Sequence, residues 1–138
     1  MATDLRIPHT LYEELIAHCR SRYPKEACGL LAGKDGRVTQ VYPMTNVEDS
    51  PIGYSMDPRE QFTIEKQMRQ HGQTLLAIFH SHTASAAYPS SVDVRLAISP
   101  EISYVLVSLK DQAHPDVKSY RIDGQTITPE SVTIEPTV

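Results

Sequence analysis

The chain has 138 residues, which suits one compact domain and is too short for two ordinary domains or an α/β barrel of about 250 residues. Hydrophobic residues make up 40% of the sequence and charged residues 22%, and no apolar run approaches the roughly 18 residues that a membrane span needs. The formal net charge of −4 does not favour binding to nucleic acids or anionic membranes. We therefore expect a single domain over residues 1–138.

The amino-terminal residues and the cysteines indicate a cytoplasmic location. No cationic segment followed by an apolar stretch marks the amino terminus for secretion. A reducing compartment and a well-sized core need no disulfide between Cys19 and Cys28. Cys28 lies close to Glu26, which leaves open a thiol protease with a histidine partner, but its apolar neighbours favour a small buried hydrophobe.

The first half of the chain predicts one helix and a hairpin. A helix is expected over Thr10–Arg22, where apolar residues recur at spacings of three and four. Two strands follow, Cys28–Gly33 and Arg37–Met44, joined by a turn at Asp35-Gly36 that tolerates positive φ. The composition of residues 46–53 is that of an irregular loop.

The second half predicts two more helices and five strands. Asp57, Pro58 and Glu60 form a strong helix start, with Asp57 as cap and Glu60 able to reach back, so a helix should run to about Gln70. Tyr54–Asp57 is expected as a short strand before it. Strands are expected over Thr74–His80 and Ile102–Leu109, with a short helix over Ser91–Ser99 between them. The ranges Lys118–Ile122 and Thr126–Ile134 are expected to form a final hairpin. This order predicts an α+β or mixed α/β fold around one sheet.

The segment His80-Ser81-His82 carries the most information about function. Residues two apart on a strand point to the same side, so both imidazoles can face one point. A helix that begins near Ser90 places Asp93 in its first turn, as a third ligand. Three such ligands that leave a fourth position for water are typical of a catalytic zinc. Ser90 and Asp93 also fit a helix capping box, which does not explain two histidines on one face.

A zinc hydrolase also needs a carboxylate that moves protons, and Glu26 is the candidate. It precedes a predicted strand, where its side chain can face the same cavity as the metal. A Glu taken alone is more often merely solvated. Ser90 is the candidate donor to a developing oxyanion.

These residues resemble the motif of the JAMM, or MPN-plus, metallopeptidase family. The family pattern is an upstream Glu, then His-Ser/Thr-His, seven residues, Ser, two residues and Asp. The matching positions are Glu26, His80, Ser81, His82, Ser90 and Asp93, and Pro24–Leu31 also resembles the surroundings of the family's Glu. The resemblance covers about Leu5 to Asp123. It implies a Zn²⁺ peptidase with a single mixed, curved β-sheet flanked by helices, the MPN or cytidine-deaminase-like fold.

The chain is most similar to the small bacterial-type members of that family. Those members act on sulfur-carrier proteins of ubiquitin-like fold and release an amino acid such as cysteine or an attached peptide. The resemblance therefore implies a peptidase or isopeptidase that cuts after the terminal glycine of such a carrier. Thr83 departs from the family pattern, which usually has Pro, and this affects the rim of the site rather than a ligand.

Two other functions use the same residues differently. Many relatives of the fold lack the metal ligands and serve as scaffolds, although the ligand set is intact in this sequence. An iron-dependent oxygenase also combines two histidines with one carboxylate, usually on a β-barrel with a different ligand order. The metal content and the presence of hydrolysis separate these possibilities.

Overall fold

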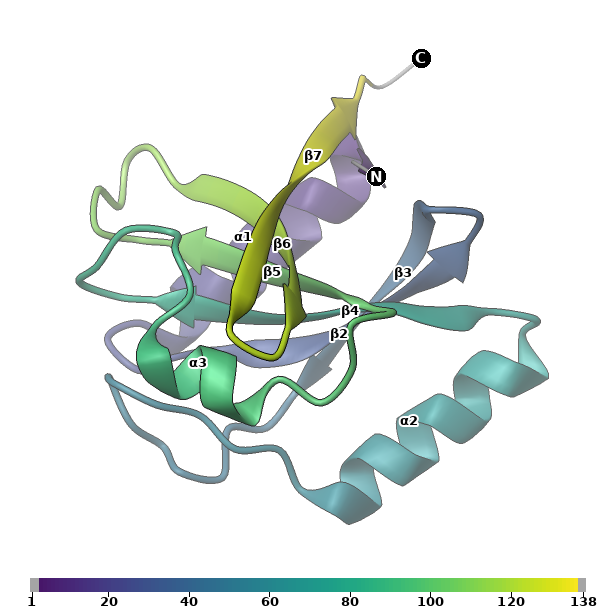
Figure 1. The fold of residues 1–138 in the computed structure, drawn as a ribbon, viewed down its shortest axis with the longest axis horizontal. Helices are drawn as coiled ribbons and strands as arrows, with labels where there is room; N and C mark the ends of the chain where they lie inside the picture. The colour runs from purple at the N-terminus through teal and green to yellow at the C-terminus, as the bar shows by residue number, and fades with distance from the viewer. Residues whose placement is uncertain (1–2, 137–138) are drawn as a thin grey trace.

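The computed structural model describes residues 3–136, which form three helices and seven strands (Figure 1). In chain order these are β1 (Asp4–Pro8), α1 (His9–Arg22), β2 (Cys28–Lys34), β3 (Arg37–Met44), α2 (Pro58–Gln70), β4 (Thr74–His82), α3 (Ser91–Leu96), β5 (Ser103–Ser108), β6 (Asp116–Asp123) and β7 (Thr126–Glu135). None of the helices in this part of the chain has the length and apolar character needed to cross a membrane.

The predicted helices and hairpins are confirmed, with shifted boundaries. Asp35 and Gly36 have φ of 52° and 76°, as the predicted turn between β2 and β3 requires. The carboxylate of Asp57 caps α2 by accepting a hydrogen bond from the Arg59 N–H. Glu60 does not reach back to that cap, because its side chain accepts a hydrogen bond from the Thr45 N–H instead. The predicted short strand over Tyr54–Asp57 is wrong, since this segment is irregular.

The α+β class and the mixed sheet are confirmed, but the sheet closes on itself, whereas a curved sheet flanked by helices was expected. Its strand order is β1-β3-β2-β4-β5-β6-β7. The pairs β4–β5, β1–β7 and β1–β3 are parallel and the others are antiparallel. β1 closes the sheet by pairing with β7 from Asp4 to Pro8 and with β3 at Arg6. This strand of only five residues was not predicted from the sequence.

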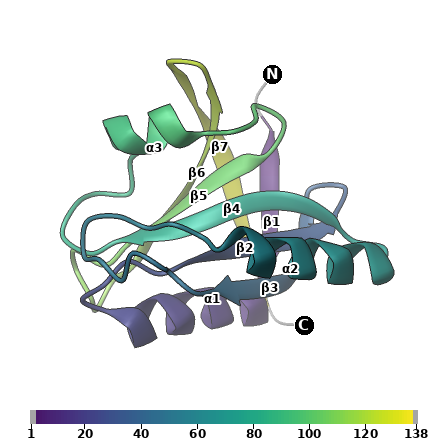
Figure 2. The same ribbon diagram turned by 90° about the horizontal axis from the view of Figure 1, so that it is seen from below.

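The helices cover two faces of the sheet, and each face has its own hydrophobic core. Figure 2 shows the sheet between α1 on one side and α3 on the other. Leu15 of α1 packs in one buried cluster with Phe79 and Val105, and Met68 of α2 packs in the other with Leu30 and Leu106. Alternate residues of each central strand therefore enter opposite cores.

The candidate histidines lie at the carboxyl end of β4, a central strand paired with β2 and β5. β4 extends through His82, two residues beyond the predicted end. His80 is opposite Cys28 on β2 and Leu106 on β5. Because β4 is held on both sides, the histidines have a fixed backbone.

Candidate metal centre

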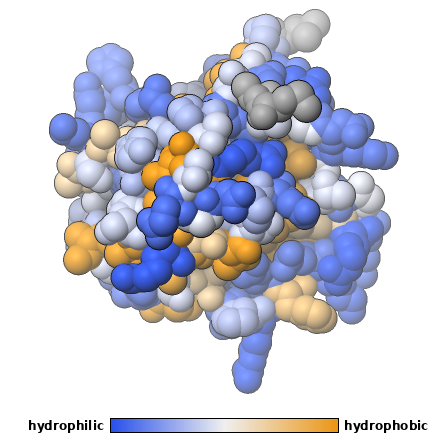
Figure 3. Space-filling view, viewed as in Figure 1, coloured by the Kyte–Doolittle hydropathy of each residue, from blue (hydrophilic) through white to orange (hydrophobic). Residues whose placement is uncertain are grey.

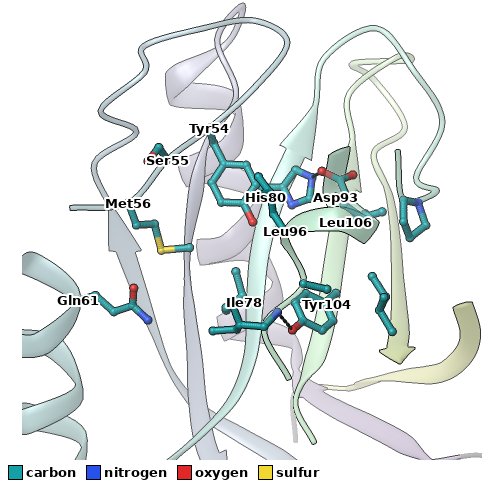
Figure 4. Close-up of a pocket in the computed structure, with 14 residues that line it drawn as sticks. Tyr54, Ser55, Met56, Gln61, Ile78, His80, Asp93, Leu96, Tyr104 and Leu106 are labelled. Carbon is teal, nitrogen blue, oxygen red and sulfur yellow. Dashed lines mark hydrogen bonds and ion pairs between the residues drawn. The ribbon is translucent and has the colours of Figure 1, made fainter. Parts of the chain in front are cut away.

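Three side chains from β4 and α3 meet at one point. The Nε2 atoms of His80 and His82 lie 3.1 Å apart. One carboxylate oxygen of Asp93 lies 3.2 Å from Nε2 of His80, and the other lies 3.1 Å from Nε2 of His82. Figure 4 shows the His80 ring directed at the Asp93 carboxylate. Among residues 3–136, this is the group of at least three His, Cys, Asp or Glu side chains that is suited to a metal ion.

The spacing of the three ligand groups fits a tetrahedral metal ion. Ligand atoms at the usual 2.0–2.1 Å from zinc are roughly 3.3 Å apart at a tetrahedral angle. The observed separations of 3.1–3.2 Å are close to this value. Three protein ligands that are open on one side match the pattern of a catalytic metal site rather than a closed structural one.

Local structure orients each of these groups. His82 has its Nδ1 atom 2.9 Å from the carbonyl oxygen of Ala86, which directs Nε2 toward the other groups. Ser90 caps α3: its hydroxyl accepts from the Asp93 N–H, and its own N–H donates to the Asp93 carboxylate at 2.8 Å. The capping box and the metal site therefore share Asp93, and the two interpretations of this residue are compatible.

The electrostatics favour the ligand forms of His80 and Asp93. Burial lowers the pKa of His80 in spite of its hydrogen bond with Asp93. Burial alone would raise the pKa of Asp93, but hydrogen bonds with His80 and His82 hold it well below its usual range. Burial likewise opposes protonation of His82, yet its contacts with Asp93 and Ala86 raise its pKa overall. A neutral imidazole and an ionised carboxylate are the forms that bind metals.

Glu26 is buried beside this cluster, and its backbone is fixed on both sides. Its N–H donates to the Ser50 carbonyl at 2.8 Å, and its carbonyl accepts from the Asn46 side chain at 3.0 Å. The next residue, Ala27, is bonded to Ser81, which lies between the two histidines on β4. The Ser81 hydroxyl accepts from the Ala27 N–H at 2.8 Å, and the Ser81 N–H donates to the Ala27 carbonyl at 3.0 Å. Ser81 thus has the structural role expected from strand alternation.

Burial raises the pKa of the Glu26 carboxyl to about 7, and the charge of Asp93 adds to this increase while His82 opposes it. A carboxyl with this pKa exchanges protons near neutrality. Cys28 is buried and its pKa is raised to about 12, mainly by burial, so it does not supply a thiolate nucleophile. The structure therefore rules against the thiol-protease alternative.

Two cavities meet at the cluster. The first, of about 280 Å³, includes His80, Ile78 and Tyr104 among its lining residues (Figure 4). The second, of about 370 Å³, contains Glu26, His82 and Ser90. Tyr54, Asp93 and Leu96 line both. All five candidate residues thus line one or both of two adjoining spaces.

Two residues at this site, Tyr54 and Asn46, were not predicted to belong to it. Tyr54 stacks on His80 with ring centroids 4.5 Å apart, a contact that the expected short strand over Tyr54–Asp57 did not predict. Asn46 is buried and uses its side chain for four hydrogen bonds, two of which reach Glu26 and Ser55. No periodic pattern identifies either residue, because both belong to an irregular loop. Thr83, the departure noted above, donates to the Pro51 carbonyl and ties the rim to that loop.

Comparison with known proteins agrees with this site and fold. Residues 8–123 match the sequence model of a family described as prokaryotic homologs of the JAB domain. A CysO-cysteine peptidase of Mycobacterium tuberculosis is 43% identical over 126 residues, which are 90% of this chain and 86% of that protein.

Solved structures show the same fold. A Desulfitobacterium hafniense protein has a TM-score of 0.89 with 41% identity, over 97% of this chain and 94% of that one. A JAB1/MPN domain protein of Archaeoglobus fulgidus has a TM-score of 0.60, with 18% identity over 94% and 99% of the two chains, and this likeness shows the fold alone. The chain belongs to the prokaryotic JAB-domain family, which confirms the membership that its motif predicted.

The Ser81 hydroxyl gives a testable link between β4 and the Glu26 segment. Ser81→Ala leaves the Ala27 N–H buried without its partner, so we expect the free energy of unfolding to fall by about 1–3 kcal/mol. Urea unfolding measures this change. Ser21→Ala is the control, because Ser21 lies on the surface, and it should change stability by less than about 0.5 kcal/mol. Equal effects of the two variants would contradict the proposed link.

The raised pKa of Glu26 predicts a pH-dependent stability of the metal-free protein. The folded state favours protonated Glu26, so its stabilising effect is complete below pH 4.5 and is lost as the pH rises through about 7. Glu26→Gln removes this titration. We expect this variant to be more stable than the unmodified protein by about 1–3 kcal/mol at pH 8, with a smaller difference toward pH 4.5.

Urea unfolding in the presence of a chelator, at several pH values, measures this difference. Glu14→Gln on the exposed face of α1 is the control and should show little change at any pH. A difference between Glu26→Gln and the unmodified protein that does not vary with pH would contradict the prediction.

Proposed function

We propose that the protein is a zinc-dependent peptidase that hydrolyses the bond after the C-terminal glycine of a ubiquitin-like sulfur-carrier protein. The observation that carries this proposal is the meeting of His80, His82 and Asp93 within 3.2 Å of one another, beside a buried glutamate. The name of the Mycobacterium tuberculosis relative, a CysO-cysteine peptidase, supports the substrate class.

The choice of zinc rests on the ligand groups. Two imidazoles and one carboxylate suit zinc, and their spacing fits its preferred tetrahedral geometry. His80, His82 and Asp93 would hold the ion. Zinc bound at such a site lowers the pKa of water to about 7 and polarises a carbonyl group.

Glu26 is proposed to move the proton. Its carboxylate accepts a proton from the attacking water and passes it to the nitrogen of the leaving amine as the C–N bond breaks. Burial raises its pKa to about 7 in the metal-free protein, and a carboxyl whose pKa is raised in this way is a better proton acceptor than a solvated one. Its position in the second cavity, together with His82 and Asp93, supports this role.

Ser90 is proposed to stabilise the oxyanion of the tetrahedral intermediate. Its oxygen already accepts the Asp93 N–H, which leaves its own proton free to donate. A hydroxyl fixed in this way is oriented before the substrate binds, which is the condition for effective transition-state stabilisation. Ser90 therefore serves as helix cap and as oxyanion donor.

We also propose that residues 1–138 act as one domain. The family match ends at residue 123, but β7 lies beyond it and pairs with both β6 and β1. The last strand is thus part of the same closed sheet. The expected cytoplasmic location stays a prediction.

Elemental analysis of protein purified without added metal tests the zinc site. We expect about one zinc per chain. His82→Ala removes a ligand and should lose most of the zinc, whereas His71→Ala, on an exposed residue beyond α2, should retain it. Iron in place of zinc favours the oxygenase alternative, and full zinc content in His82→Ala would overturn the ligand assignment.

Hydrolysis of CysO-cysteine tests the reaction and the role of Glu26. The unmodified protein should release cysteine, and Glu26→Gln should keep its zinc but lose about 10²- to 10⁴-fold in kcat. Release of cysteine is measured by mass spectrometry of the carrier, which becomes lighter by one cysteine residue, and metal content by elemental analysis. Glu65→Gln on α2 is the control and should keep full activity. Full turnover by Glu26→Gln would remove this residue from the mechanism, and zinc-loaded protein without hydrolysis would favour a scaffold.

A further inference from the structure

Tyr54 stands where the two cavities meet, and its ring packs against a candidate metal ligand. It lines both cavities, whereas His80 lines only the first and Glu26 only the second. Its ring is stacked on the His80 imidazole at a centroid distance of 4.5 Å and an angle of 25°. The ring therefore forms part of the boundary between the two spaces, together with Asp93 and Leu96.

The position of Glu26 assigns a part of the substrate to each cavity. This step rests on the proposed function, in which Glu26 gives its proton to the leaving amine. Because Glu26 lines only the second cavity, the leaving group lies there. The scissile carbonyl then lies near Asp93, and the glycine tail of the carrier extends into the first cavity.

Several polar side chains line the first cavity, among them Tyr54, Ser55 and Gln61, and Tyr54 is the one stacked on His80. The Tyr104 hydroxyl is fully used, because it accepts from the Ile98 and Ser99 N–H groups and donates to the Ser99 carbonyl. Among the cavity residues drawn in Figure 4, the Tyr54 hydroxyl forms no hydrogen bond. The figure shows it directed past His80 toward the Ile78 and Tyr104 side of the cavity.

The surroundings of Tyr54 hold this hydroxyl in place before substrate binds. The side chain of Asn46 accepts from the Ser55 N–H and donates to the Gly53 carbonyl, so both neighbours of Tyr54 are fixed. The ring stack on His80 limits rotation of the side chain. A donor that is already oriented loses little entropy on binding.

A glycine tail has no side chains, so its recognition depends on backbone N–H and C=O groups. We infer that Tyr54 is a specificity-determining residue whose hydroxyl donates a hydrogen bond to a backbone carbonyl of the carrier's tail in the first cavity. The apolar residues Ile78 and Leu106 line the same cavity and exclude water from this contact. The hydrogen bond forms with substrate and product alike, because the tail is the same in both.

Tyr54→Phe tests this contact, because it removes the hydroxyl and keeps the ring stack. With CysO-cysteine as substrate we expect KM to rise about 3- to 10-fold while kcat changes less than about twofold. The dissociation constant of CysO for the metal-free protein, measured by calorimetry, should rise by a similar factor. Tyr12→Phe on α1 is the control and should leave all three quantities unchanged.

Other outcomes would overturn the inference. An unchanged KM and dissociation constant would show that the hydroxyl does not contact the tail. A lower kcat with unchanged KM would mean that Tyr54 acts only through His80. If the unmodified protein neither cleaves CysO-cysteine nor binds CysO, the proposed function fails, and the role of Tyr54 fails with it. If the unmodified protein cleaves CysO-cysteine and Tyr54→Phe does so with the same KM and kcat, only the inference about Tyr54 fails.

Discussion

The site depends on the short separation between two imidazole nitrogens. The Nε2 atoms of His80 and His82 are 3.1 Å apart, and each also faces an oxygen of Asp93. Two nitrogen lone pairs at this distance repel each other unless a hydrogen on one of the nitrogens or a metal ion lies between them. A neutral N–H···N hydrogen bond satisfies this condition in the metal-free protein, and a bound metal ion would satisfy it with both nitrogens and Asp93 as ligands. The fold therefore holds the three groups in an arrangement that a metal ion fits.

The rigid backbone around the cluster makes this arrangement possible. β4 is hydrogen-bonded on both sides, and its Phe79 packs in the core beneath α1. Ser81 joins the same strand to Ala27, so the segment with Glu26 moves with the histidines. Asn46 then connects Glu26 to the loop that carries Tyr54. A small number of buried hydrogen bonds thus sets the relative positions of the ligands, the proposed base and the cavity wall.

The parts of this site that follow from local rules could be predicted from the sequence. Strand alternation places His80 and His82 on one face, and helix capping places Asp93 in the first turn of α3. Position along the chain says little about Glu26, and its assignment came mainly from the family resemblance. Its position depends on residues that are distant in sequence, because its N–H donates to Ser50 and the next residue, Ala27, is bonded to Ser81.

The parts of the fold that follow from local rules could also be predicted from the sequence. Helices with apolar periodicity and hairpins with Asp-Gly turns were found, because these signals lie within a few neighbouring residues. β1 was missed because five residues with only Leu5 and Ile7 buried give too short an alternation, and its partner β7 lies at the other end of the chain.

The ligands and the cavity walls are held by different kinds of structure. His80, His82 and Asp93 belong to regular elements, so small changes in sequence around them leave their geometry intact. The walls include Tyr54 and Ile52 from an irregular loop, and Leu96 and Ile98 at the exposed end of α3. Figure 3 shows hydrophobic residues among polar ones on the face that carries α3. Loops tolerate substitution better than central strands, so the choice of substrate can change while the metal site is preserved.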